Sequence, residues 1–445
     1  ALNFIWHDFP MKVFEGHLPE FLCTLWIPIV GYGMAYLSGL TVKHMGEPGD
    51  LAYTIKCVHE KGYISMDHVL PMVCASQFGI LGGGSLGPEA PLVAVCAALG
   101  GYVSRVILKR TDRNIIRKHT LMGMAGALAA FFGCPLGGSL FALEVNSRFG
   151  VEYFEHMVES IICGEITLCV FRSLAGLPIA PIWTISSTKL VNATTNDVVV
   201  GAIIGLIGAG IAAIFKKFHM IVMAELKQRE LLNEADAPKR ALLGATIVVI
   251  LGMFIPQTMF WGEYEFQTIS TMSPTNTLEH IWPNRSIIGF QMNNGFTCLL
   301  VAFGKLIAIS CTVAGGYRGG FIFPFFASGA AFGRAFCTIL PSVPVSLSCL
   351  SFAAAINVGI TRTSLASPII LCFLAGEPNA MSGVLAASLV SLVATTYMPF
   401  IVTQQPREDM QHQCIFPNMG ASSNSGLDAE SEMDHVTVDE EKSLL

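Results

Sequence analysis

Long apolar segments recur along the chain and predict helices that cross a membrane. Residues 21–40, 198–214, 241–255, 298–314 and 383–398 are each long and apolar enough to cross a bilayer. Other apolar segments, such as 92–107 and 366–374, are short or interrupted by Gly and Pro. Interrupted helices persist at membrane depth only when they are buried in protein or line a cavity. The pattern therefore predicts an all-α polytopic membrane protein with broken and re-entrant helices.

The amino-acid composition indicates a membrane protein and argues against a soluble protein, a nucleic-acid binder and a cysteine-based metal site. Of 445 residues, 52% are hydrophobic and 13% are charged, whereas a soluble protein carries about a quarter charged residues. The net charge of −6 gives no reason to expect a nucleic-acid partner. Thirteen cysteines contain no C-x-x-C pair, and most lie in apolar segments, where cysteine behaves as a small hydrophobic residue. We expect no metal site, cofactor or enzymatic activity.

The order of these segments predicts two halves and a tail. Residues 1–190 and 191–405 each contain long helices and a glycine-rich break, which is the sequence sign of an inverted repeat with a site between the halves. The chain begins at Ala1 rather than Met, so the first half is expected to lack an N-terminal piece. Residues 406–445 are acidic and nearly free of aromatics, which predicts a disordered cytosolic tail. The tail ends in an acidic dileucine, which leaves plasma membrane and endomembrane both open.

Basic residues gather in two connections between apolar segments, and the positive-inside rule places both in the cytosol. One connection contains Arg105, Lys109, Arg110, Arg113, Arg117 and Lys118. The other is flanked by Lys216, Lys217, Lys227, Arg229, Lys239 and Arg240.

One carboxylate stands at membrane depth, in Gly87-Pro88-Glu89-Ala90-Pro91. An ionisable group at that depth costs about 2.5–3.5 kcal/mol and marks a functional site by default. The apolar segment that follows predicts a helix with Glu89 in its first turn. A helix N-terminus offers free N–H groups and partial positive charge to anions. A carboxylate there can occupy the place of a permeant anion and leave that place when it is protonated. The sequence therefore predicts that Glu89 gates an anion pathway.

Three motifs in order resemble those of the CLC chloride channel and transporter family. They are Gly87-Pro88-Glu89-Ala90-Pro91, the stretch from Ala125-Gly126-Ala127 to Leu143-Glu144, and Gly319-Gly320-Phe321-Ile322-Phe323-Pro324. The resemblance covers about residues 18–405 and implies an antiparallel, all-helical homodimer with an anion pathway in each subunit. It identifies Glu89 with the gating glutamate and implies anion contacts from Gly87, Ala90, Gly320, Phe321, Ile322 and Phe323.

The chain departs from the family at its first anion-binding motif. His44-Met45-Gly46-Glu47-Pro48 stands where the resemblance places a serine-containing motif, so Met45, Gly46 and Pro48 are the anion-site candidates. Backbone N–H groups at a helix start over Gly46 to Asp50 can still hold an anion. A Met at this position resembles fluoride-selective members. The late coordinating tyrosine of the family falls on Tyr397, or the alignment places Ile401 there.

A second departure concerns proton coupling. Proton-coupled members resemble one another in a second glutamate, directly after the residue that matches Glu144, and this chain carries Val145 there. Because a proton relay needs a titratable group and valine has none, we expect a passive chloride channel. Glu152, Glu155 and His156 leave a chloride/proton or fluoride/proton antiporter open as the alternative.

Two further interpretations follow from the motifs. The glycines at 315–320 leave backbone N–H groups unshielded at a helix start that can replace the hydration shell of an anion. The sequence Gly83-Gly84-Ser85-Leu86-Gly87 is formally G-x-S-x-G, so an intramembrane serine hydrolase is a remote alternative. That alternative requires a strand before Ser85 and a base within reach.

Overall fold

The computed structural model describes residues 1–14, 17, 23–46, 48–49, 51–146, 156–185, 192–274, 277–278, 286–401 and 404. These residues form sixteen α-helices and one isolated β-bridge, which confirms the all-α prediction. Residues 1–190 contribute α1 (Phe9–Phe14), α3 (Trp26–Met45), α4 (Leu51–Glu60), α5 (Val69–Leu81), α6 (Glu89–Tyr102), α7 (Arg113–Phe132), α8 (Pro135–Glu144) and α9 (Met157–Ala175). Later residues form α10 (Thr195–Gln228), α11 (Ala237–Phe254), α12 (Glu263–Thr271), α13 (Gly295–Ala314), α14 (Ile322–Ile339), α15 (Val345–Thr361), α16 (Ala366–Ala375) and α17 (Met381–Ala394). The predicted tail, 406–445, lies outside the described residues.

Five helices in the described part are long and apolar enough to span a bilayer: Glu89–Ile107, Thr195–Gln228, Glu234–Phe254, Gly295–Ala314 and Ile322–Ile339. The predicted spans 21–40 and 383–398 are not among these five, and α17, in the second of them, has only fourteen residues. Residues 92–107, predicted to be short or broken, instead lie in one continuous span, whose last five residues, Val103–Ile107, are π-helical. Its glycines allow close packing instead, because a Cβ on Gly100 would collide with the carbonyl oxygen of His119 in α7. By contrast, α16 has only ten residues, as its interrupted sequence predicted.

Local sequence explains where the long helices begin and end. The Thr194 hydroxyl and the Asp197 carboxylate cap each other's backbone at the start of α10, and Asn294 and Thr297 do the same for α13. After α7 the chain turns through Gly133 at φ 65°, a backbone conformation that favours glycine. That turn lets α8 fold back onto α7, against which it packs.

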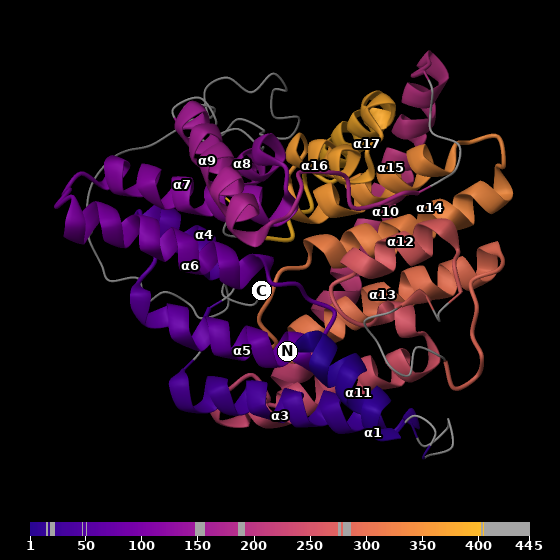
Figure 1. Ribbon diagram of the computed structural model, residues 1–445, viewed down its shortest axis with the longest axis horizontal. Coiled ribbons are helices and arrows are strands. Elements are labelled where there is room, and N and C mark those ends of the chain that lie inside the picture. Colours follow the sequence, from indigo (N-terminus) through magenta and orange to yellow (C-terminus); the bar gives the residue numbers. More distant parts are fainter. Residues whose placement is uncertain are drawn as a thin grey trace, which may run out of the picture.

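Two helices that begin at glycine-rich breaks point their first turns at the middle of the molecule. Figure 1 shows α6 reaching the middle from one side and α14 from the other. Each packs along the helix that follows it, α6 against α7 and α14 against α15. The element order also repeats, because the ten-residue helices α8 and α16 come after α7 and α15.

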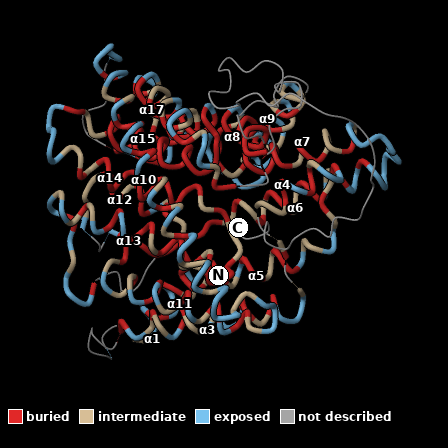
Figure 2. Tube along the Cα trace, turned by 180° about the vertical axis from the view of Figure 1, so that it is seen from behind, coloured by how far each residue is buried: buried red, intermediate tan, exposed pale blue. Residues whose placement is uncertain are grey.

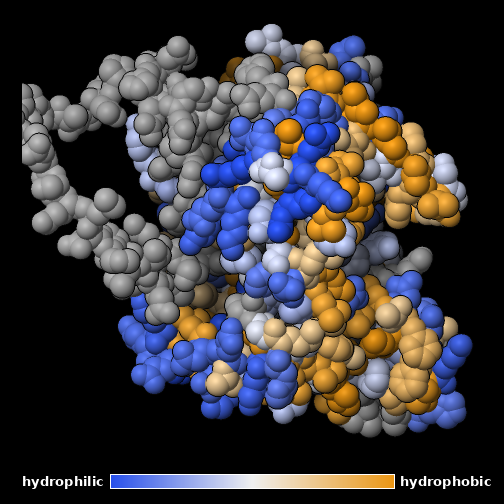
Figure 3. All heavy atoms as spheres, turned by 90° about the vertical axis from the view of Figure 1, so that its left-hand side faces the viewer, coloured by the Kyte–Doolittle hydropathy of each residue, from blue (hydrophilic) through white to orange (hydrophobic). Residues whose placement is uncertain are grey.

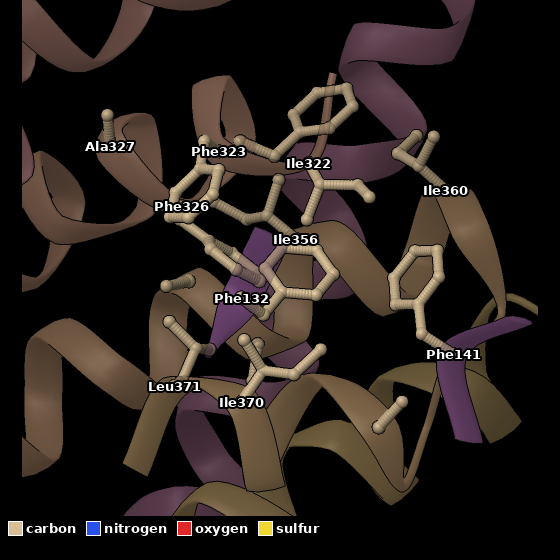
Figure 4. Packing of buried hydrophobic residues seen from close by; sticks show 14 of the residues in the cluster. Phe132, Phe141, Ile322, Phe323, Phe326, Ala327, Ile356, Ile360, Ile370 and Leu371 are labelled. Carbon is tan, nitrogen blue, oxygen red and sulfur yellow. The ribbon is translucent and has the colours of Figure 1, made fainter. Parts of the chain in front are cut away.

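Buried aromatic residues hold the start of α14 in place. Buried positions concentrate in the interior, and exposed positions lie along the rim and the turns (Figure 2). Phe323 packs its ring against Phe132 of α7 at a centroid distance of 5.6 Å, and Phe326, Ile356 and Ile370 lie in the same cluster (Figure 4). Burial of each phenylalanine stabilises the fold by roughly 1.5–3 kcal/mol. This packing fixes the backbone of the α14 first turn relative to the first half of the chain.

Candidate anion site

The two glycine-rich breaks meet and hydrogen-bond to each other. The Gly87 N–H donates to the Gly320 carbonyl at 2.7 Å, and the Gly320 N–H donates to the Gly87 carbonyl at 2.8 Å. The loop before α6 is fixed further by the Ser85 N–H, which donates to Thr312 Oγ1 at 3.1 Å. Residues more than 200 positions apart are therefore joined into one rigid backbone junction in front of α6 and α14.

Glu89 is the first residue of α6, as predicted, and its side chain lies over this junction with 1% of its surface exposed. Its Oε1 accepts a hydrogen bond of 3.4 Å from the Phe323 N–H in the first turn of α14. Its Oε2 is buried and has no hydrogen-bond partner among the described residues. A Cβ on either Gly87 or Gly320 would collide with this oxygen. Both glycines are therefore needed for the carboxylate to lie here.

The position of this carboxylate is suited to an anion. The helix starts of α6 and α14 converge on it, and both bring partial positive charge from their macrodipoles. Backbone N–H groups at such starts are donors that anions accept from. The Glu89 carboxylate thus carries its negative charge at a position where the surrounding helix starts stabilise an anion.

A cavity of about 30 Å³ adjoins Glu89. One buried water needs roughly 10–15 Å³, so the cavity has room for a small solute. The predicted residues Glu89, Ala90, Val145, Gly320, Phe321 and Ile322 all line it. The other lining residues are Leu51, Val93, Met124, Leu128, Phe141 and Gly319. Apart from Gly319, which belongs to the third motif, these residues were not predicted, because an apolar residue that faces a cavity gives the same sequence signal as one in the core.

Phe323 contributes its backbone rather than its ring. Its N–H donates to Glu89, while its ring packs in the aromatic core away from the cavity, 5.9 Å from the Trp183 ring. The side chains that face the cavity at this helix start are Phe321 and Ile322. An aromatic residue, Phe321, therefore narrows the cavity.

The structure does not bring Met45, Gly46 or Tyr397 to the cavity. Met45 is the last residue of α3 and is 41% exposed, and Gly46 at φ 83° turns the chain after it. Because α4 starts only at Leu51, the residue from this region that lines the cavity is Leu51. Pro48 is buried and lines a separate cavity of about 10 Å³. Glu47 and Asp50 lie outside the described residues.

Tyr397 is 92% exposed, and the chain next to it supplies the buried side chains instead. Phe400 lies with its ring 6.3 Å from the ring of Phe321, and Ile401 is buried beside it. The exposed Tyr397 is therefore unsuited to coordinate an anion in this conformation. The alternative alignment, which placed Ile401 at the coordinating position, agrees with this burial.

Val145 and Glu144 follow each other at the end of α8 but face different surroundings. Val145 lines the cavity, and its carbonyl accepts a hydrogen bond of 2.9 Å from Gln404 Nε2. The Glu144 carboxylate is fully buried and accepts from the backbone N–H groups of Leu365 and Ala366 at the start of α16, at 2.9 and 2.8 Å. Glu144 therefore caps another helix, and the cavity has an aliphatic side chain where a proton carrier would stand.

Two sequence hypotheses can be compared with this geometry. The residues before Ser85 form α5, a helix, so the strand that a nucleophile elbow requires is replaced by helix. His156 directly precedes α9, while Glu152 and Glu155 lie outside the described residues. Neither a hydrolase geometry nor a substitute proton route is assembled at the cavity by the described residues.

Comparisons with known proteins agree with the site and the fold. A putative ion-transport protein, YfeO, from Escherichia coli O139:H28 is 24% identical over 352 residues, which cover 77% of this chain and 76% of that protein. A solved CLC-type fluoride/proton antiporter superposes with a TM-score of 0.66 at 21% identity, over 91% of this chain and 94% of that one. A slow cyanobacterial chloride/proton antiporter superposes with a TM-score of 0.71 at 17% identity, over 90% and 91% of the two chains.

The structural likenesses, at these identities, concern the fold: a polytopic bundle of broken helices. The family model of voltage gated chloride channels matches residues 34–396, which include all three motifs and the cavity. Multi-pass placement in a membrane and transport of ions follow from this match and from the apolar helices. The chain belongs to the voltage-gated chloride channel family, the CLC family of anion channels and transporters.

Proposed function

We propose that this protein is a passive channel for chloride or a similar small anion and that Glu89 is its gate. One observation carries the proposal: the Glu89 carboxylate lies where the starts of α6 and α14 converge, hydrogen-bonded to a backbone N–H that an anion would otherwise use. The carboxylate competes with the permeant anion for this place.

Protonation or displacement of Glu89 opens the pathway. Two negative charges about 4 Å apart repel by roughly 4 kcal/mol at an effective dielectric constant of 20, so a carboxylate and an anion do not share the site. Once protonated, Glu89 loses this repulsion and its preference for the helix starts. The anion then contacts the Phe323 N–H at the start of α14, which Glu89 has released.

Passive flow is favoured by the residue at the end of α8. Val145 faces the cavity and cannot hold a proton, and the neighbouring Glu144 is engaged in capping α16. A coupled exchanger needs a second proton carrier between the cavity and the cytosol. The chloride/proton and fluoride/proton antiporter alternatives are distinguished from a channel by measuring proton movement together with anion movement.

We also propose a homodimer in which α9 and α17 contact the partner subunit. α9 exposes a continuous set of large apolar side chains: Val158, Ile162, Ile166, Val170 and Leu174. α17 adds Leu389 and Val393. An exposed apolar patch of this kind marks either lipid contact or a protein interface. Chemical crosslinking in membranes tests which it is.

The gate is tested by Glu89→Ala in liposomes. We expect chloride efflux in this variant to be open at neutral pH and insensitive to pH, because no carboxylate remains to occupy the site. Glu225→Ala is the matched control, since Glu225 is an exposed acid of α10 that pairs with Arg229. Wild-type pH dependence in Glu89→Ala would falsify the gate assignment.

A further inference from the structure

Three exposed cations without carboxylate partners lie at the end of the helix that starts with Glu89. Arg105, Lys109 and Arg110 are exposed, and none forms an ion pair with a described residue. The nearby acids are engaged elsewhere: Asp112 caps α7 through the Asn114 N–H, and Glu159 pairs with Lys118. Among the described residues, the cluster of Arg105, Lys109 and Arg110 is therefore a site of positive charge without paired carboxylates.

The second basic connection offers a contrast within the same chain. There, Arg229 pairs with Glu225 at 2.6 Å, and Lys239 pairs with Asp236 at 2.7 Å. The positive-inside prediction alone would explain basic residues in both connections. It does not explain why Arg229 and Lys239 have carboxylate partners, whereas Arg105, Lys109 and Arg110 have none among the described residues.

The cluster is arranged around the boundary between apolar and polar surface. The apolar span Glu89–Ile107 ends within it, and Val106, Ile107 and Leu108 expose large side chains beside the cations. Figure 3 shows the face that carries the α6–α7 turn, with hydrophilic side chains gathered next to a broad hydrophobic surface. A ligand that fits both surfaces has an anionic headgroup and apolar chains.

Two local features hold the cations in place. The Arg105 guanidinium stacks over the Tyr63 ring, 3.6 Å from its centroid, which leaves its outer N–H groups free to donate. Lys109 has φ 51°, a conformation that a helix end usually gives to glycine, and the Arg110 N–H closes that end by donating to the Ser104 carbonyl at 2.9 Å. The site is therefore partly pre-ordered.

We propose that Arg105, Lys109 and Arg110 form a binding site for an anionic phospholipid of the cytosolic leaflet, with its phosphorylated headgroup on the cations. Its acyl chains lie along the exposed apolar face of Val106 and Ile107. Clusters of basic residues at the cytosolic end of a membrane helix bind such lipids electrostatically. The site is independent of the anion pathway, although occupancy restrains the helix whose other end carries Glu89.

The test measures binding of fluorescent phosphatidylinositol 4-phosphate to the full chain in phosphatidylcholine nanodiscs. The variant is Arg105→Gln/Lys109→Gln/Arg110→Gln. The matched control, Lys227→Gln/Arg229→Gln/Lys239→Gln, removes the same charge from the second basic connection. Each cation near the membrane surface contributes about fivefold in affinity, so the variant should bind about 100-fold more weakly and the control nearly as well as wild type.

Single variants Lys109→Gln and Arg110→Gln keep the test valid if the triple variant misfolds, with a loss of about fivefold each. Higher salt should weaken wild-type binding, because these charges are exposed to solvent. Equal weakening in the variant and the control would overturn the proposal. Competition by soluble inositol phosphate as strong as that by the lipid would also overturn it, because the acyl chains would then contribute nothing.

Discussion

Replacing Gly320 with Ala tests the gate without removing its carboxylate. A Cβ on Gly320 would lie 2.9 Å from Glu89 Cβ and Cδ and would also collide with Oε2. Carbon atoms pack favourably at about 3.5–4.0 Å, so this contact is repulsive. Gly320 cannot retreat, because its N–H and carbonyl both bond to Gly87. The contacts with Cδ and Oε2 are relieved only when the Glu89 carboxylate rotates away, whereas the contact between the two Cβ atoms is present in both positions of the carboxylate.

The size of the effect follows from the cost of overpacking. An added methyl group in a packed site costs typically about 1–3 kcal/mol, and the part of this cost that comes from Cδ and Oε2 falls only on the state in which Glu89 lies inward. A penalty of about 2 kcal/mol lowers the ratio of inward to outward carboxylate about 30-fold. If the inward state predominates in wild type, chloride flux at neutral pH should rise by about this factor, and its dependence on pH should shrink.

The assay is chloride efflux from proteoliposomes at neutral and acidic pH. Gly210→Ala is the control, because a Cβ there meets no atom within 4 Å. In a Gly320→Ala/Glu89→Ala double variant, flux should equal that of Glu89→Ala alone, since both changes act on the same gate. A folded Gly320→Ala protein with wild-type flux and wild-type pH dependence would refute the reasoning.

Two further predictions test other contacts. Glu144→Ala should lower the melting temperature of the detergent-solubilised protein markedly, because it leaves the N–H groups of Leu365 and Ala366 unpaired, at a cost of about 1–3 kcal/mol each. Glu159→Ala at the surface should change the melting temperature little. Equal melting temperatures of the two variants would contradict the capping role of Glu144. Tyr397→Phe should leave chloride flux within about twofold of wild type, because the hydroxyl is on an exposed side chain and a surface change of this kind is nearly neutral. A large loss of chloride flux in this variant would place Tyr397 in the pathway.

The position of Glu89 could be predicted from the sequence because its signals are local. Pro88 and the preceding glycines mark a helix start, and the apolar segment after them sets its depth. The meeting of Gly87 with Gly320 could be expected only through the resemblance, since no local pattern links residues so far apart. The Glu89 carboxylate, which leaves no space for a Cβ on either residue, now explains why both positions are glycine.

The rest of the cavity depended on tertiary packing. Met124 and Leu128 lie in the apolar second half of α7, and Phe141 lies in the apolar α8, so no periodic pattern marks the face that meets the cavity. Met45 and Tyr397 were chosen by alignment with family motifs, and the loops after α3 and α17 place other residues inward. Motif alignment alone does not show how glycine turns and loop lengths direct the chain at these two places.

The most direct test of the proposed mechanism is chloride efflux from proteoliposomes recorded together with external pH. A passive channel gated by Glu89 predicts chloride efflux with no stoichiometric proton movement, in wild type and in Glu89→Ala. Proton movement driven by a chloride gradient in wild type and abolished in Glu89→Ala would contradict passive flow and make the protein an exchanger.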